Sequence, residues 1–424
     1  MSQAPSMNHA LSMNQALSMN QATSMNLQVQ LFLLAGGLTV LGLVAISSAS
    51  VEFAEAAYGD MWYHTRRHGA YLLLALLGAA VCYSIPVNFW CRSGWVWLLI
   101  ACLLLILVLI PGVGRNVNGS QRWLVLGSMT LQPSELAKGA VVLYLAGYLL
   151  RQRESLRQDW NGLLRPLLIL AVVAALLLAE PDFGATVIVV ATALGMLFLA
   201  GMRMLHLALI SLATAAVGVA LITAAPYRMQ RLTAYTDPWA DPFGAGFQLV
   251  QSLIAFGRGG WTGVGMGNSV QKLFYLPEAH TDFVFSIWAE ETGFVGALLL
   301  IMLFLALVLR IFALGKRAET LGESYAAFVC YGVALMFSGQ AFVNMGVSAG
   351  LLPTKGLTLP FVSYGGTSLI ASCGLLAIVL RIAKDLPAQA SGRKKSAPAK
   401  GGDALAKGQK KATRKNKKSA GQKR

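Results

Sequence analysis

Ten apolar segments, each about as long as a bilayer is thick, constrain this chain more than any other feature of its sequence. A helix needs about 20 apolar residues to cross the roughly 30 Å hydrocarbon core. The alternating pattern of a membrane β-barrel is absent, and only 12% of the residues are charged, against about 25% in soluble domains. The sequence therefore predicts an all-α polytopic membrane protein with ten transmembrane helices. They are placed near residues 31–50, 69–86, 94–112, 134–150, 163–180, 185–201, 204–224, 282–310, 325–346 and 366–384.

The longest predicted connection joins the seventh and eighth helices and covers residues 225–281. Connections of this length tend to carry function. An even number of helices places both termini on one side of the membrane, and the basic C-terminal segment marks that side as the cytoplasm. We therefore predict cytoplasmic termini and a large extracytoplasmic loop between the seventh and eighth helices.

Two polar tails flank the predicted membrane domain, residues 30–384. Residues 1–29 repeat a six-residue unit (SMNHAL, SMNQAL, SMNQAT) without any cation, which predicts disorder and not a signal peptide. Residues 385–424 are predicted to be a disordered cytoplasmic tail, and most of the net charge of +16 lies after Ser391. Contact with anionic lipid is favoured over nucleic-acid binding for this tail. The five cysteines lack metal-type spacing and are interpreted as buried apolar residues.

Ten basic residues fall on or near the predicted outer side, where membrane proteins usually have few cations. A long loop is translocated regardless of its charge, which accounts for those between Arg228 and Lys272 but not for Arg115, Arg122 and Lys355 in short loops. An anionic ligand on the outer face would explain them. The ten are Arg66, Arg67, Arg115, Arg122, Lys138, Arg228, Arg231, Arg258, Lys272 and Lys355.

Asp282 stands where the eighth apolar segment begins. In a helix from this point, Asp282, Ser286, Ala289 and Gly293 would share one face. An ionisable group beside bilayer-length apolar sequence is costly unless it has a function or a partner. The sequence leaves three roles open for this carboxylate: a functional group facing a cavity, a helix cap, or an ion pair with His280 or Lys272.

Four other polar segments accompany it. Glu135 and Lys138 are neighbours on one helix face, either as a neutral pair or with Lys138 and Arg122 facing a diphosphate. The acids of EPDFGAT, residues 180–186, are interpreted as loop caps. The glycine-rich segment 257–267 suits close backbone approach; its N–H groups would also suit a phosphate, but no strand precedes them as in a dinucleotide-binding fingerprint. Lys355 is either an anion contact or a contact to loop backbone.

Together these motifs resemble the SEDS family of shape, elongation, division and sporulation proteins. NGSQRW, LQPSELAK, EPDFGAT, LPEAHTDFVF and PTKGLTLPFVSYGGTS occur in the family's order over about residues 30–384, and two of them favour its division members over its elongation members. The two tails and the additional Ala185 depart from the family pattern. The resemblance implies polymerisation of lipid II into glycan strands at the outer face of the bacterial inner membrane. It also implies that Asp282, Arg122, Glu135 and Lys138 belong to the site.

The expected reaction is a single, inverting displacement in which a sugar hydroxyl of one lipid II attacks another and undecaprenyl diphosphate leaves. Asp282 is the predicted base, and no cofactor is required, although a divalent cation such as Mg²⁺ or Mn²⁺ is possible. A lipid II flippase and a non-catalytic scaffold are the alternatives. The resemblance further implies a class B penicillin-binding transpeptidase and other division proteins as partners, at the septum. The predicted substrate-binding residues are Arg122, Glu135, Lys138, His280 and Lys355.

Overall fold

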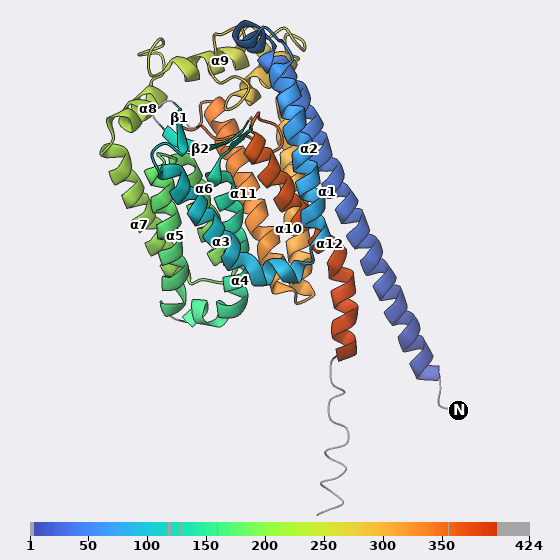
Figure 1. Ribbon diagram of the computed structural model, residues 1–424. Helices are drawn as coiled ribbons and strands as arrows, with labels where there is room; N and C mark the ends of the chain where they lie inside the picture. The colour runs from blue at the N-terminus through green and yellow to red at the C-terminus, as the bar shows by residue number, and fades with distance from the viewer. Residues whose placement is uncertain (1–3, 118–119, 128, 159, 355, 397–424) are drawn as a thin grey trace, which may run out of the picture.

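The computed structural model describes residues 4–117, 120–127, 129–158, 160–354 and 356–396. Its long helices stand side by side in a bundle, and two short helices, a small sheet and several loops gather at one end (Figure 1). We call this the loop end. The ten long helices are α1 (Ala4–Tyr58), α2 (Tyr63–Ser84), α3 (Val87–Leu109), α4 (Pro133–Gln158), α5 (Asn161–Ala179), α6 (Phe183–Leu199), α7 (Met204–Thr223), α10 (Val284–Thr320), α11 (Ser324–Ser348) and α12 (Gly366–Ser396).

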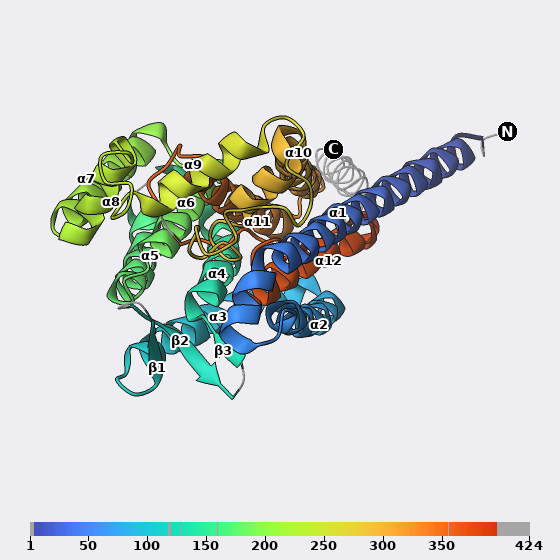
Figure 2. The same cartoon turned by 90° about the horizontal axis from the view of Figure 1, so that it is seen from above.

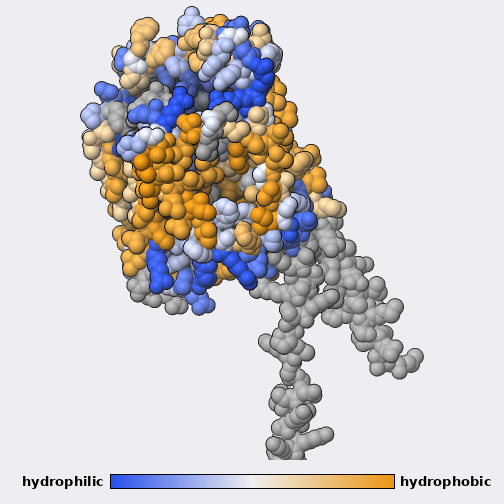
Figure 3. Space-filling model, viewed as in Figure 1, coloured by the Kyte–Doolittle hydropathy of each residue, from blue (hydrophilic) through white to orange (hydrophobic). Residues whose placement is uncertain are grey.

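The surface of the bundle is that of a membrane protein. Among the described residues, seven helices are long and apolar enough to span a bilayer, namely α1, α3, α5, α7, α10, α11 and α12, and α6 is apolar but shorter. The face seen in Figure 3 carries an apolar belt between two polar ends. A multi-pass membrane protein is thus confirmed. The count of ten stays a prediction, because α2 begins with two arginines and two histidines and α4 includes six charged residues.

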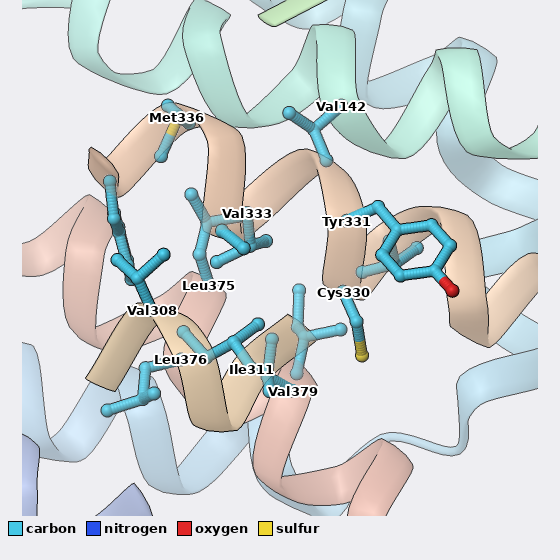
Figure 4. Packing of buried hydrophobic residues seen from close by; sticks show 14 of the residues in the cluster. Val142, Val308, Ile311, Cys330, Tyr331, Val333, Met336, Leu375, Leu376 and Val379 are labelled. Carbon is cyan, nitrogen blue, oxygen red and sulfur yellow. The ribbon is translucent and has the colours of Figure 1, made fainter. Parts of the chain in front are cut away.

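Helix α11 lies at the centre of the bundle, packed against α10, α4 and α6, while α12 packs against α2 and α1. Figure 4 shows side chains of four helices meeting there, among them Val142 of α4, Ile311 of α10 and Val379 of α12. A Cβ on Gly332 of α11 would lie 2.6 Å from a Val142 methyl carbon. A small residue therefore permits this helix crossing, as is common where helices pack within a membrane.

A small antiparallel sheet is the main departure from the all-α prediction. It consists of β1 (Gly114–Val117), β2 (Ser120–Leu126) and β3 (Met129–Leu131), in that order, with Arg115 opposite Trp123 and Leu124 opposite Leu131. In the view from above, the sheet lies at the margin of the bundle, beside α3 and α4 (Figure 2). The sequence did contain a signal for it, since Asn–Gly is the typical dipeptide of a two-residue hairpin connection and residues 118–119 are Asn–Gly.

The two tails also differ from the prediction where the structure describes them. Helix α1 extends back to Ala4 through the repeat for which disorder was predicted. Ala, Met, Leu and Gln favour helix, and the repeat contains no glycine that would interrupt one. Helix α12 extends to Ser396, and residues 397–424 of the predicted tail lie outside the described residues.

Candidate functional site

A hollow at the loop end, which we call the central cavity, has a volume of about 550 Å³. It is walled by the sheet, the start of α4, the α5–α6 turn, the short helices α8 (Pro226–Thr236) and α9 (Phe247–Gly259), the segment before α10 and the loop before α12. Charged, polar and aromatic side chains predominate among its lining residues. They include Arg115, Arg122, Trp123, Gln132, Glu135, Asp182, Arg231, Gln248, Glu278, Asp282, Tyr364 and Thr367.

A second hollow of about 330 Å³, the side cavity, adjoins the first and shares Arg122, Asp182 and Arg231 with it. Its remaining wall is more apolar and includes Ile222 at the end of α7 and Leu232 on α8. The two cavities together offer a polar chamber next to a partly apolar one, with arginines at their common border.

Asp282 lies in the turn before α10, and not on the helix as predicted. The helix begins at Val284, and the carbonyl oxygen of Glu278 accepts the N–H groups of Asp282 (3.1 Å) and Phe283 (3.3 Å). Asn344 of α11 donates its side-chain amide to the backbone oxygen of Asp282 at 2.9 Å. The backbone of the acid is thus fixed from two sides, while its side chain faces the central cavity.

The competing roles for Asp282 are not found in the described part of the chain. No side chain caps α10. Lys272, one suggested partner, instead forms an ion pair with Glu291, with 3.2 Å between Nζ and Oε1. Among the described residues, no hydrogen bond or ion pair engages the Asp282 carboxylate. None of the groups that the structure describes therefore competes with a substrate for the carboxylate.

The surroundings of Asp282 bring its pKa close to neutrality. Burial raises the pKa of this carboxyl to about 7, and the negative charge of Glu278 acts in the same direction. The positive charges of Arg122 and Arg231 oppose the shift. A carboxyl with a pKa near 7 is ionised in a substantial fraction of molecules at neutral pH and still binds a proton well, which suits a general base.

Three arginines bring positive charge to the central cavity. Arg122 of β2 donates from Nε to the backbone oxygen of Glu180 at 3.0 Å and from a terminal nitrogen to that of Pro181, so that the sheet is attached to the α5–α6 turn. Arg115 of β1 and Arg231 of α8 also line the cavity. Sequence reasoning placed both on the outer face but did not assign them to the site.

The other predicted binding residues are distributed unevenly. Lys138 and Glu135 form a buried ion pair of 2.8 Å, in which Glu135 lines the cavity and Lys138, with its side chain 1% exposed, does not. His280 also does not line it, and burial lowers the pKa of this imidazole to about 4, so it is neutral at physiological pH. Lys355 lies outside the described residues, although its neighbours Thr354 and Gly356 line both cavities.

The two acids of the α5–α6 turn have different environments. Asp182 caps α6, because Oδ1 accepts from the N–H of Ala185 at 3.1 Å and Oδ2 accepts from Ser134 at 3.0 Å. The carboxyl oxygens of Glu180 are buried without a hydrogen-bond partner among the described residues. Burial raises the pKa of Glu180 to about 8, with a further contribution from Asp182. The loop-cap interpretation is thus confirmed for Asp182 only.

Comparison with known proteins identifies the family of this chain. Residues 28–387 match the model of the cell cycle protein family of FtsW, RodA and SpoVE. The chain belongs to this family. Two curated relatives are named probable peptidoglycan glycosyltransferase FtsW: that of Alcanivorax borkumensis is 52% identical over 345 residues, 81% of this chain and 90% of that protein. That of Pseudomonas fluorescens is 52% identical over 353 residues, 82% and 86% of the two chains.

Solved structures of the FtsW, RodA and SpoVE family share this fold. RodA of Thermus thermophilus superposes with a TM-score of 0.62 at 31% identity and covers 84% of this chain and 96% of its own. A chain from a structure described as structural coordination of polymerization and crosslinking by a peptidoglycan synthase complex gives 0.69 at 35% identity, covering 84% and 97%. The resemblance to SEDS proteins is therefore confirmed over the predicted membrane domain.

Proposed function

We propose that this chain is a peptidoglycan glycosyltransferase that polymerises lipid II into β-1,4-linked glycan strands for the septal wall. The activity is that of its FtsW relatives. The observation that carries the mechanism is the Asp282 carboxylate, which no described group engages, in a cavity that three arginines line.

Asp282 acts as the general base. The 4-hydroxyl oxygen of N-acetylglucosamine on one lipid II attacks the anomeric carbon of N-acetylmuramic acid on the growing chain. Its proton passes to the Asp282 carboxylate as the bond between the anomeric carbon and the diphosphate oxygen breaks. Because the donor is α-linked, one displacement gives the β bond and no covalent intermediate is needed.

The arginines stabilise the leaving group. Undecaprenyl diphosphate departs with additional negative charge on its oxygens, and fixed positive groups near developing charge lower the barrier. Arg122 and Arg231 border both cavities, so the diphosphate lies at the common border and the isoprenoid chain extends along the more apolar side cavity. The sugars occupy the central cavity, where Trp123, Tyr364 and Gln132 offer aromatic faces and amide groups.

A divalent cation such as Mg²⁺ or Mn²⁺ would have to share its coordination with the substrate. The described residues contain no group of three His, Cys, Asp or Glu side chains placed to hold a metal ion. Asp182 and Glu135 are already engaged by hydrogen bonds or an ion pair. Asp282 would contribute one carboxylate to such a cation, beside oxygens of the diphosphate. No step of the proposed reaction depends on the cation.

The cellular setting follows the same proposal. The protein works in the inner membrane at the division septum, with cytoplasmic termini and with the loop end outside. A class B transpeptidase is the expected partner, together with other division proteins. The synthase complex described for a structural neighbour, which couples polymerization to crosslinking, supports this partnership.

Polymerisation of labelled lipid II by the full-length protein, purified with its transpeptidase, tests the proposal. Wild type should form glycan strands, and Asp282→Asn, which keeps shape and removes the base, should reduce the rate by about 10²–10⁴-fold. Asp237→Asn is the matched control, because this exposed acid on the loop end lines neither cavity. Undiminished polymerisation by Asp282→Asn would refute the base. If wild type transfers lipid II across vesicle membranes but forms no polymer, the protein is a flippase. If wild type does neither while the transpeptidase stays active, the protein is a scaffold.

A further inference from the structure

Helix α10 is broken at Gly293, whose φ of 69° and ψ of −167° are not helical. The break separates a short segment, residues 284–292, from the long remainder of the helix. Asp282 lies two residues before this short segment. We call residues 284–292 the acid-bearing segment, because the backbone of Asp282 leads directly into it. Because the helix is interrupted at Gly293, the orientation of Asp282 depends on contacts between this segment and the rest of the protein.

Backbone hydrogen bonds from the glycine-rich segment 257–267 help to fix the acid-bearing segment. The N–H groups of Val264 and Gly265 donate to the backbone oxygens of Glu290 and Glu291, each at 3.0 Å, and the N–H of Phe294 donates to the oxygen of Gly260 at 2.9 Å. These bonds satisfy backbone groups that the break leaves without helical partners. They also leave the N–H groups of Val264 and Gly265 unavailable to a phosphate.

Two adjacent buried acids complete the hold, each with its own cation. Glu290 accepts from the N–H of Val270 at 3.1 Å and lies 3.5 Å from Nε of Arg258. Glu291 pairs with Nζ of Lys272 at 3.2 Å and accepts from Ser48 of α1. The side chains of Glu291 and Lys272 are 1% and 6% exposed. We call these four charged residues the ion-pair cluster.

Such a cluster is sensitive to the loss of one member. A buried carboxylate without its cation is strongly unfavourable, whereas removal of both charges can be nearly neutral. Neighbouring positions on a helix point about 100° apart, so Glu290 and Glu291 reach different parts of the preceding loop. Together they fix both the rotation and the position of the acid-bearing segment.

We propose that Lys272 and Glu291 are positioning residues for Asp282: their ion pair holds the acid-bearing segment so that the carboxylate faces the central cavity. The inference rests on the proposed function for its catalytic consequence only. Lys272 also donates to the backbone oxygen of Gly267 at 2.7 Å, so this one cation joins the glycine-rich segment, α1 and α10.

The test is a cycle of Lys272→Met, Glu291→Gln and the double variant in the full-length protein with its transpeptidase. Lys272→Met should lower kcat by about 10- to 100-fold with little change in KM, because a displacement of about 1 Å at a reacting group has effects of this size. The double variant should be more active than Lys272→Met, since no unpaired charge remains buried. Lys272→Arg should stay close to wild type.

An ion pair between α4 and the far end of α10 provides a matched control. Arg153 of α4 pairs with Glu319 at the far end of α10 at 3.0 Å, with side chains 32% and 40% exposed. Arg153→Met should leave kcat within about twofold, because exposed pairs contribute little.

Hydrogen exchange provides a readout independent of activity. Lys272→Met should accelerate exchange in residues 284–292 and leave residues 294–320 unchanged. If wild type makes no polymer, the proposed function fails while the exchange result still decides whether the ion pair holds the segment. Unchanged exchange, unchanged kcat in an active enzyme, or an equal effect of Arg153→Met would overturn the inference.

Discussion

Asp282 owes its proposed role to its surroundings more than to its residue type. Desolvation and the nearby Glu278 raise its pKa to about 7, while Arg122 and Arg231 keep it from rising further. In the proposed reaction, the same fixed cations that stabilise the leaving diphosphate therefore also set the ionisation of the base.

The pH dependence of polymerisation should follow this carboxyl. The base must be ionised, so kcat/KM should rise with pH below about 7, where the protonated form prevails, and level off above it. The measurement is initial polymerisation rate against pH at low substrate. Equal initial rates at all pH values between about 5 and 8 would contradict the assignment.

Arg231→Gln offers a second form of the same measurement. Loss of a nearby positive charge disfavours the ionised carboxylate, so the acid limb should move to higher pH. Arg203→Gln is the control, because Arg203 lies before α7 at the opposite end of that helix from the side cavity.

At this scale the sequence could identify chemistry but not distance. Asp282 and Arg122 were predicted and do line one cavity. Arg115 and Arg231 were predicted to lie on the outer side of the membrane. Topology predicts the side on which a residue lies, but it does not predict which residues lie next to it. For Glu135 and Lys138 the sequence left open a neutral pair or a contact to the substrate, because only packing decides which member of an i, i+3 pair is covered.

Among the elements, the loop before α12 depends on a close crossing with α1. A Cβ on Gly42 would lie 2.5 Å from the backbone oxygen of Phe361 and 2.7 Å from the Cα of Val362. That loop carries Thr354 and Tyr364 into the wall of the central cavity. A glycine on one helix therefore sets the position of a wall of the site.

Gly42→Ala should displace this loop, lowering both the melting temperature and the polymerisation rate, with a cost of about 1–3 kcal/mol typical of overpacking. Thermal unfolding in detergent and the polymerisation assay measure the two effects. Gly37→Ala on the same helix is the control, since a Cβ there meets no atom within 4 Å. Equal behaviour of the two variants would show that the crossing is not tight.

Most of the long helices could be predicted from the sequence, because seven of those described are long and apolar enough to span a bilayer. The break at Gly293 could not, since its non-helical dihedrals are stabilised by bonds to residues 260–265, a tertiary contact that no local pattern reveals. The position of the sheet also depends on a tertiary contact, because Arg122 of β2 donates to Pro181, which lies 59 positions later in the chain.

For the whole molecule, the separation of functions along the bundle axis is clear. The apolar belt lies between the ends (Figure 3), and the short helices, the sheet and both cavities lie at the loop end. A flippase should offer polar access from both leaflets. The charged lining residues of the two cavities all lie at one end, which favours an enzyme.

Labelling with a membrane-impermeant maleimide tests the predicted ten crossings, including α2 and α4. In a cysteine-free background, Met61→Cys should react in intact spheroplasts, while Asn88→Cys and Glu154→Cys should react only after permeabilisation. All three positions are exposed, so protection reports topology and not burial. Reaction of Asn88→Cys in intact cells would show that α2 does not cross.

The placement of the two cavities has a pharmacological consequence. In the proposed topology both cavities open on the outer face of the inner membrane, where a compound that never enters the cytoplasm can reach them. Removal by pumps that collect their cargo inside the cell would not protect the bacterium from it. The border of Arg122 and Arg231, between a polar chamber and an apolar one, suits an inhibitor with an anionic centre and one greasy arm.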